Sequence, residues 1–99
     1  GRLGFVRDGK IVKNDFDAFL NLLNNNNYEK TKTLLGTRND YVLYFEFDNN
    51  KLSYGGRTIY GKYDDLTKIK ADNLIKINRV LYYDLDNNGK IVNMVILVF

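Results

Sequence analysis

The residues best suited to chemistry lie near the C-terminal end, where residues 84–91 read DLDNNGKI. Asp84, Asp86 and Asn88 place side-chain oxygens at positions 1, 3 and 5 of a calcium-binding loop, and a glycine follows at position 6. Position 12, where such a loop supplies a bidentate glutamate, is Val95. The pattern therefore favours a hairpin turn with an Asn-Gly pair, and calcium binding is the weaker alternative.

Two pairs of carboxylates are the other candidates for catalysis: Asp64 with Asp65, and Asp15 with Asp17. General acid–base catalysis by a pair needs one carboxyl group with a raised pKa in a dry site. Carboxylates that are adjacent in a polar loop, or that stand at the start of a helix, are usually solvated or interact with the helix dipole. We therefore expect neither pair to be catalytic, and a carboxylate hydrolase is the least favoured function.

The 99 residues contain no histidine and no cysteine, which excludes several kinds of site. Cys–His and Ser–His–Asp catalysis, zinc sites built from Cys or His, and disulfides all need these residues. Gly55 and Gly56 do not form a phosphate-binding loop, because a strand pattern and not a helix follows them. The sequence therefore predicts a protein that is not an enzyme and has no cofactor.

Charge and composition indicate an ordinary globular domain. The net charge is +3, but lysines and arginines are interleaved with acids, which is typical of a solvated surface and not of a nucleic-acid-binding stripe. No run of about 18 apolar residues is present, so we expect no transmembrane segment. The chain begins with Gly-Arg and not with Met, which indicates the loss of a signal sequence, a lipoprotein leader with its lipid anchor, or an expression tag.

The elements that must position these residues begin with an arm or hairpin over residues 1–13, where an Asp-Gly pair separates short apolar runs. Residues 14–36 then read as a helical hairpin. Its first helix has apolar residues spaced i, i+3, i+4 and i+7 and ends at four consecutive asparagines. Its second helix spans residues 28–35, and Gly36 stands where a left-handed C′ residue is needed.

Residues 40–99 alternate with a period of two, which predicts an antiparallel sheet. The expected strands are 41–47 with its odd positions buried, 52–62 with a break at the two glycines, 75–85, and 90–99. The last strand is apolar on both sides apart from Asn93, so we expect it to be central or covered by the N-terminal hairpin. The predicted fold is a two-layer α+β domain, with a helix-loop-helix packed on a four-stranded antiparallel meander.

Such a meander leaves one side of the sheet without helices. If odd positions face the helices, then Tyr44, Tyr60, Lys62 and Tyr82 lie on the open side. Tyrosines with interspersed charges are typical of contact surfaces, because a tyrosine gives a large contact area at a low entropy cost. We therefore expect these four residues to bind another protein. The competing interpretation is that aromatic residues simply favour strands and pair across them.

Three segments resemble the bacterial SmpA/OmlA-like and beta-lactamase-inhibitor-protein-like envelope domains. They are residues 28–37 (YEKTKTLLGT), the aromatic strand 41–47, and the closing hairpin 81–92. The resemblance implies a helix-loop-helix followed by a four-stranded antiparallel sheet. It also implies a non-enzymatic protein of the bacterial envelope that binds other proteins through its sheet, and it carries over no catalytic residue.

The expected function is therefore that of a non-catalytic protein-binding domain in the bacterial envelope or secreted from the cell. The alternative is a small inhibitor or immunity-type protein, cytoplasmic or phage-derived, that blocks an enzyme by stoichiometric binding. In both cases the expected partner is another protein and not nucleic acid.

Overall fold

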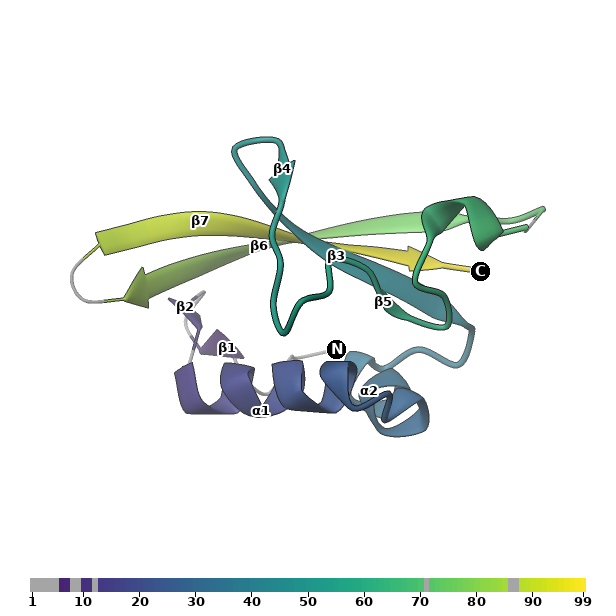
Figure 1. Cartoon of the computed structure of the whole chain (residues 1–99), viewed down its shortest axis with the longest axis horizontal. Helices are drawn as coiled ribbons and strands as arrows, with labels where there is room; N and C mark the ends of the chain where they lie inside the picture. Colours follow the sequence, from purple (N-terminus) through teal and green to yellow (C-terminus); the bar gives the residue numbers. More distant parts are fainter. Residues whose placement is uncertain (1–5, 8–9, 12, 71, 86–87) are drawn as a thin grey trace.

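Two helices packed on a mostly antiparallel sheet make up the fold, as the sequence predicts (Figure 1). The computed structural model describes residues 6–7, 10–11, 13–70, 72–85 and 88–99, and the side chains within 15–70, 72–82 and 91–99. In chain order the elements are β1 (Val6–Arg7), β2 (Lys10–Ile11), α1 (Lys13–Asn24), α2 (Tyr28–Leu35), β3 (Tyr41–Phe47), β4 (Asn50–Lys51), β5 (Tyr60–Gly61), the 3-10 helix η1 (Leu66–Lys68), β6 (Ile75–Leu85) and β7 (Asn88–Val98).

Both helices form where the apolar spacing predicts them. One side of α1 is buried against the sheet, and its buried residues are Phe16, Phe19, Leu20 and Leu23. In the turn after α1, Asn26 adopts a left-handed conformation with φ 57°, which asparagine tolerates better than most residues. Gly36 ends α2 at φ 73°, and backbone N–H groups beyond the helix bond to the carbonyls of its last turn. No helix among the described residues is long and apolar enough to cross a membrane.

The strand order differs from the predicted meander. The sheet runs β1-β2-β6-β7-β3-β4, and β5 also pairs with β3. The last strand, β7, therefore lies between β3 and β6, as its two apolar sides indicate. The meander prediction was wrong because consecutive strands were expected to pair, whereas β3 pairs along most of its length with the final strand of the chain.

The predicted second strand is mostly not a strand. Within residues 52–62 only β5 pairs with β3 as a strand, and the other strand paired with β3 on this edge, β4, lies just before that range. Between β4 and β5, Tyr54 and Arg57 form a tight turn closed by two backbone hydrogen bonds. Gly55 and Gly56 make this turn at φ 62° and 77°, which confirms the predicted break at the glycines. At the N-terminus β1 and β2 pair as a hairpin, and its predicted Asp-Gly turn lies outside the described residues.

The sheet carries a buried core on each side. On the helix side, α1 packs against the odd positions of β3 and the even positions of β7, together with Tyr60 and Leu81. On the far side, Val42, Tyr44, Ile59, Val95 and Leu97 form a second, smaller core. This second core is covered by the segment around η1 and by Phe99, on the side of the sheet opposite the helices (Figure 1). The predicted one-sided burial of β3 was therefore wrong, and Phe47, expected in the core, is 40% exposed.

Candidate functional site

Two of the four predicted contact residues, Tyr44 and Tyr60, lie in the interior of the domain. Tyr44 is 7% exposed because the chain around η1 covers the far side of β3. Tyr60 is fully buried in the helix-side core, where its hydroxyl lies 2.7 Å from the carbonyl oxygen of Tyr54 and 2.6 Å from that of Arg57. The expectation that both rings lie on an open surface was wrong, because the far side of the sheet is closed over Tyr44 and because Tyr60 faces the helix side.

The other two predicted residues are exposed but lie far apart in the sheet. Lys62 directly follows β5, beside β3, whereas Tyr82 lies on β6, and β7 runs between these two strands. The Lys62 ammonium donates to Asp40 Oδ2 at 2.8 Å. The four residues therefore do not form one surface.

Asp40 connects α2, β3 and the chain after β5. Its carboxylate accepts from the Tyr28 hydroxyl at 2.7 Å and from Lys62, and Lys32 Nζ lies 3.9 Å away. The hydrogen bonds from Lys62 and Tyr28 hold the pKa of Asp40 below its usual value. Burial, together with the hydrogen bond to Asp40, raises the pKa of the Tyr28 hydroxyl, so this phenol stays protonated. The arrangement fastens α2 to the sheet.

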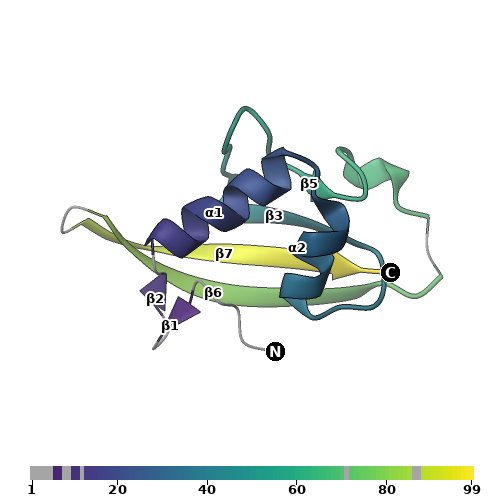
Figure 2. The same ribbon diagram turned by 90° about the horizontal axis from the view of Figure 1, so that it is seen from below.

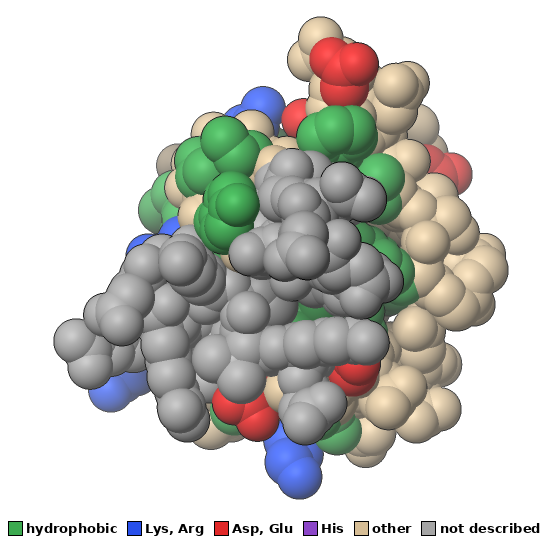
Figure 3. Space-filling model, turned by 90° about the vertical axis from the view of Figure 1, so that its left-hand side faces the viewer, with side chains coloured by type: hydrophobic (Ala, Val, Ile, Leu, Met, Phe, Trp, Pro, Cys, Tyr) green, Lys and Arg blue, Asp and Glu red, His purple; other side chains and the backbone are tan. Residues whose placement is uncertain are grey.

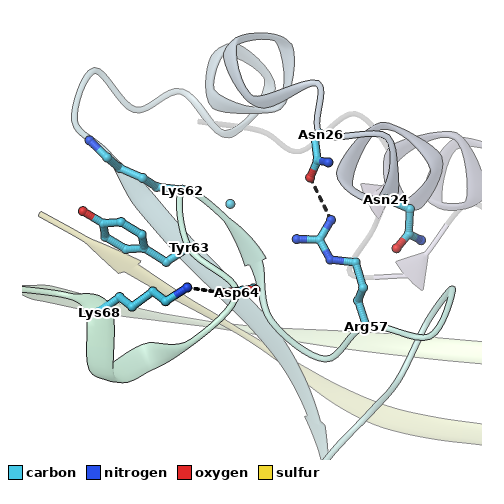
Figure 4. A pocket seen from close by; sticks show the side chains of 8 residues that line it. Asn24, Asn26, Arg57, Lys62, Tyr63, Asp64 and Lys68 are labelled. Carbon is cyan, nitrogen blue, oxygen red and sulfur yellow. Dashed lines mark hydrogen bonds and ion pairs between the residues drawn. The ribbon is translucent and has the colours of Figure 1, made fainter.

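A pocket of about 410 Å³ opens between the turn after α1, the chain after β5, and η1 (Figure 4). Arg57, Lys62 and Lys68 line it, which is a basic set suited to an anion. Each cation, however, already has a partner: Arg57 donates to Leu23 O at 3.1 Å and to Asn26 Oδ1 at 2.9 Å, Lys62 to Asp40, and Lys68 to Asp64 at 2.8 Å. The Arg57 bonds join α1 and the turn after it to the irregular segment, and the Lys68 bond lies within that segment, so we assign the pocket a structural role.

Asp64 and Asp65 are also used locally. The Lys68 ammonium holds the pKa of Asp64 below its usual value, and the backbone N–H and hydroxyl of Thr67 do the same for Asp65 at the start of η1. These shifts are opposite in sign to the one a general acid needs. The weak calcium alternative rests on Asp84, Asp86 and Asn88, whose side chains lie outside the described part of the chain.

The most unusual exposed region is along β6. Every side chain from residue 72 to residue 80 is exposed, although residues 75–80 form about half of the long strand β6. Leu74 is 50% exposed, Ile75 58% and Val80 64%. α1 lies over β3 and β7, and β6 runs along the side of the sheet away from α1 (Figure 2). The hydrophobic residues of β6 therefore contact water.

Exposed hydrophobic residues continue toward the tip of the β6–β7 hairpin. Tyr82 on β6 is directly opposite Ile91 on β7, which is 60% exposed. Hydrophobic side chains are also visible at the surface when the molecule is viewed from the hairpin end (Figure 3). We call the set Leu74, Ile75, Ile77, Val80, Tyr82 and Ile91 the β6 surface. Its strand residues lie on both faces of the sheet, with Ile75 and Ile77 on the helix side and Val80, Tyr82 and Ile91 on the far side.

Beside these side chains, most of the outer backbone edge of β6 pairs with no strand among the described residues. Of the strands that the structure describes, only β2 pairs with this edge, and it does so at the single pair Lys10 and Tyr82. Residues 75–80 therefore have β7 on one side and no described strand on the other. Two cations, Lys76 and Arg79, lie in this open stretch, and neither forms an ion pair with any residue of the described ranges.

Sequence reasoning missed this surface because alternating isoleucines normally indicate a buried face. One signal could have revealed it. A strand of 11 residues extends about 36 Å, whereas a helix of 12 residues is about 18 Å long. Two short helices cannot cover the whole of three such strands, so part of the sheet had to remain exposed.

Comparisons with known proteins do not assign a role to this surface. No protein family, no curated protein and no solved structure gives a significant match to the chain.

Proposed function

We propose that this chain is a non-catalytic protein-binding domain and that its partner binds the β6 surface. The observation that carries the proposal is the exposure of large hydrophobic side chains on both faces of β6, beside an outer edge that pairs with no described strand between residues 75 and 80. Exposed hydrophobic side chains gathered along one strand mark an interaction site, because burying them against a partner is favourable. An open strand edge adds unpaired backbone donors and acceptors to the same place.

The proposal keeps the class of function that the sequence predicts and changes the surface. Tyr82 belongs to the new surface, whereas the buried Tyr44 and Tyr60 support the fold. The resemblance to envelope domains that bind proteins through their sheets supports the same class, and with it a place in the bacterial envelope or outside the cell. An inhibitor or immunity-type protein would use the same surface, with an enzyme as its partner.

Site-specific photo-crosslinking in the source organism tests the proposal. A photoreactive phenylalanine analogue replaces Val80, which is exposed on β6, or Asn21, which is exposed on α1 and serves as the matched control. We expect a discrete cross-linked product with another polypeptide from position 80 and none from position 21. Equal products from both positions, or none from position 80, would contradict the proposal.

A further inference from the structure

We propose that the partner supplies an extended, acidic segment that pairs with β6 between residues 75 and 80 as an additional strand of the sheet. This inference deepens the proposed function and depends on it, because it assigns the binding mode and the chemistry of the segment that binds.

The backbone of β6 favours strand addition. Only every second residue of a strand directs its N–H and C=O groups to a given neighbour, so half of those in residues 75–80 bond to β7 and the other half point outward. No described strand receives the outward groups. An extended segment that takes this position would pair with them and continue the sheet, which is a common mode of peptide binding.

The side chains on the two sides of β6 define what the added strand must carry. Ile75 and Ile77 lie on the helix side, because they are directly opposite Val98 and Ile96 of that core. Lys76 lies on the far side, opposite Leu97. Arg79 lies on the helix side, opposite Met94, so the two cations are on opposite sides of β6. A segment whose apolar residues contact Ile75 and Ile77 and whose acids reach Lys76 on one side and Arg79 on the other therefore matches both sides.

Charge selects this partner over a second copy of the chain. Lys76 and Arg79 are both exposed and free of ion pairs within the described residues. If two copies paired through β6, the same two cations from each copy would enter the new interface, and like charges on paired strands are destabilising. An acidic segment instead gains complementary contacts, so the cations disfavour self-association and favour a partner of opposite charge.

A peptide titration followed by amide NMR tests the binding mode. The probe is a capped, soluble peptide of valine and glutamate, with valines placed to face Ile75 and Ile77 and glutamates placed to face Lys76 and Arg79 on the two sides of the strand. One control peptide has lysine in place of glutamate, and a second carries N-methyl groups on every other residue, which removes the donors along one edge. We expect the acidic peptide to shift the amides of residues 75–80 and to slow the hydrogen exchange of the outward ones. We expect the lysine peptide to bind about tenfold more weakly and the N-methylated peptide to leave these amides unchanged.

Charge reversal on the protein provides the reciprocal test. The K76E/R79E variant should bind the glutamate peptide about tenfold more weakly than the parent and should now prefer the lysine peptide. The matched control is K30E/R38E, which reverses the charge of two exposed residues outside β6 and should leave the preference unchanged. A change of preference by the variant excludes simple unfolding as the cause.

The outcomes separate this inference from the proposed function. If Val80 cross-links to a partner but no peptide affects residues 75–80, or if the N-methylated peptide binds as well as the parent peptide, strand addition is wrong while protein binding stands. Protection of the outward amides in the free protein would also overturn the inference. Protection that rises with protein concentration would identify a second copy on this edge, and protection independent of concentration would identify the protein's own residues there.

Discussion

The two strands that flank β7, β3 and β6, differ in how much of their outer edge is paired with other strands. The outer edge of β3 is paired over most of its length. Val42 and Leu43 pair with β5, and Glu46 and Phe47 pair with β4. Backbone N–H groups of Leu52 and Lys62 add bonds to the carbonyls of Phe45 and Tyr41 at 2.8 and 2.9 Å. In contrast, β6 has a single described pair on its outer edge, at Tyr82.

The difference follows from the order of the chain. After β3 the chain continues through residues 48–69, which return along the edge of β3 and also cover its far side. After β6 the chain turns directly into β7, which pairs with the inner edge of β6. The contrast supports a division in which β3 and its surroundings provide much of the stability of the domain, and β6 provides the binding surface that we propose.

The largest expected effect comes from truncating a buried side chain of β3, the strand whose outer edge is paired. Phe45 is fully buried, and its ring packs edge-on against Phe16, Tyr54 and Tyr60 at centroid distances of 5.7, 5.4 and 6.0 Å. Phe45→Ala should lower the free energy of unfolding by about 4 kcal/mol because it leaves a cavity. Ile75→Ala on β6 should cost less than about 1 kcal/mol, since that side chain is largely in water already. Urea denaturation of both variants gives the comparison, and similar losses would refute it.

The pairing of β5 with β3 can be disrupted at one glycine. Gly61 has φ 110°, and a Cβ atom there would lie 2.5 Å from the Tyr41 carbonyl oxygen. Gly61→Ala should therefore cost about 3 kcal/mol through backbone strain and displacement of β5.

Gly56→Ala is the matched control, because Gly56 also has a positive φ but has open space around it. It should cost about 1 kcal/mol. Thermal unfolding of the two variants separates the steric clash from the intrinsic cost of the left-handed conformation. An equal decrease in Tm would show that the close approach of β5 to β3 contributes little.

The smallest expected effect is the pH dependence of stability due to Asp40, which joins α2 to the chain after β5. Its pKa is lowered by Lys62 and Tyr28, so its stabilising effect is complete above the unfolded value of 3.8 and is lost as the pH falls through the lower folded value. Its side chain is 33% exposed, so Asp40→Asn should cost about 1 kcal/mol or less at neutral pH. The difference in unfolding free energy between parent and variant should shrink below about pH 4. A difference that persists in acid would rule out this ionic origin.

The helices and the central place of β7 could be predicted from the sequence, and the exposure of β6 could not. The i, i+3, i+4 spacing gave α1, Gly36 gave the end of α2, and the two apolar sides of the last strand indicated its central place. The far-side core escaped prediction because Ile59 is expected in a strand of the sheet and residues 64–69 have no regular period, so nothing indicated that Ile59, Leu66 and Ile69 would cover Tyr44. The exposure of Ile75 and Ile77 escaped because alternation shows which residues share a side and not whether another layer covers it.

The most direct test of the central claim is amide hydrogen exchange measured along both edges in the free protein. The account predicts that the amides of β3 exchange only through global unfolding, because their partners lie on both sides of the strand. It predicts that every second amide in residues 75–80 exchanges nearly as fast as in an unfolded chain. If those amides are protected as strongly as the amides of β3, the edge of β6 is not open, and the proposed binding surface is contradicted.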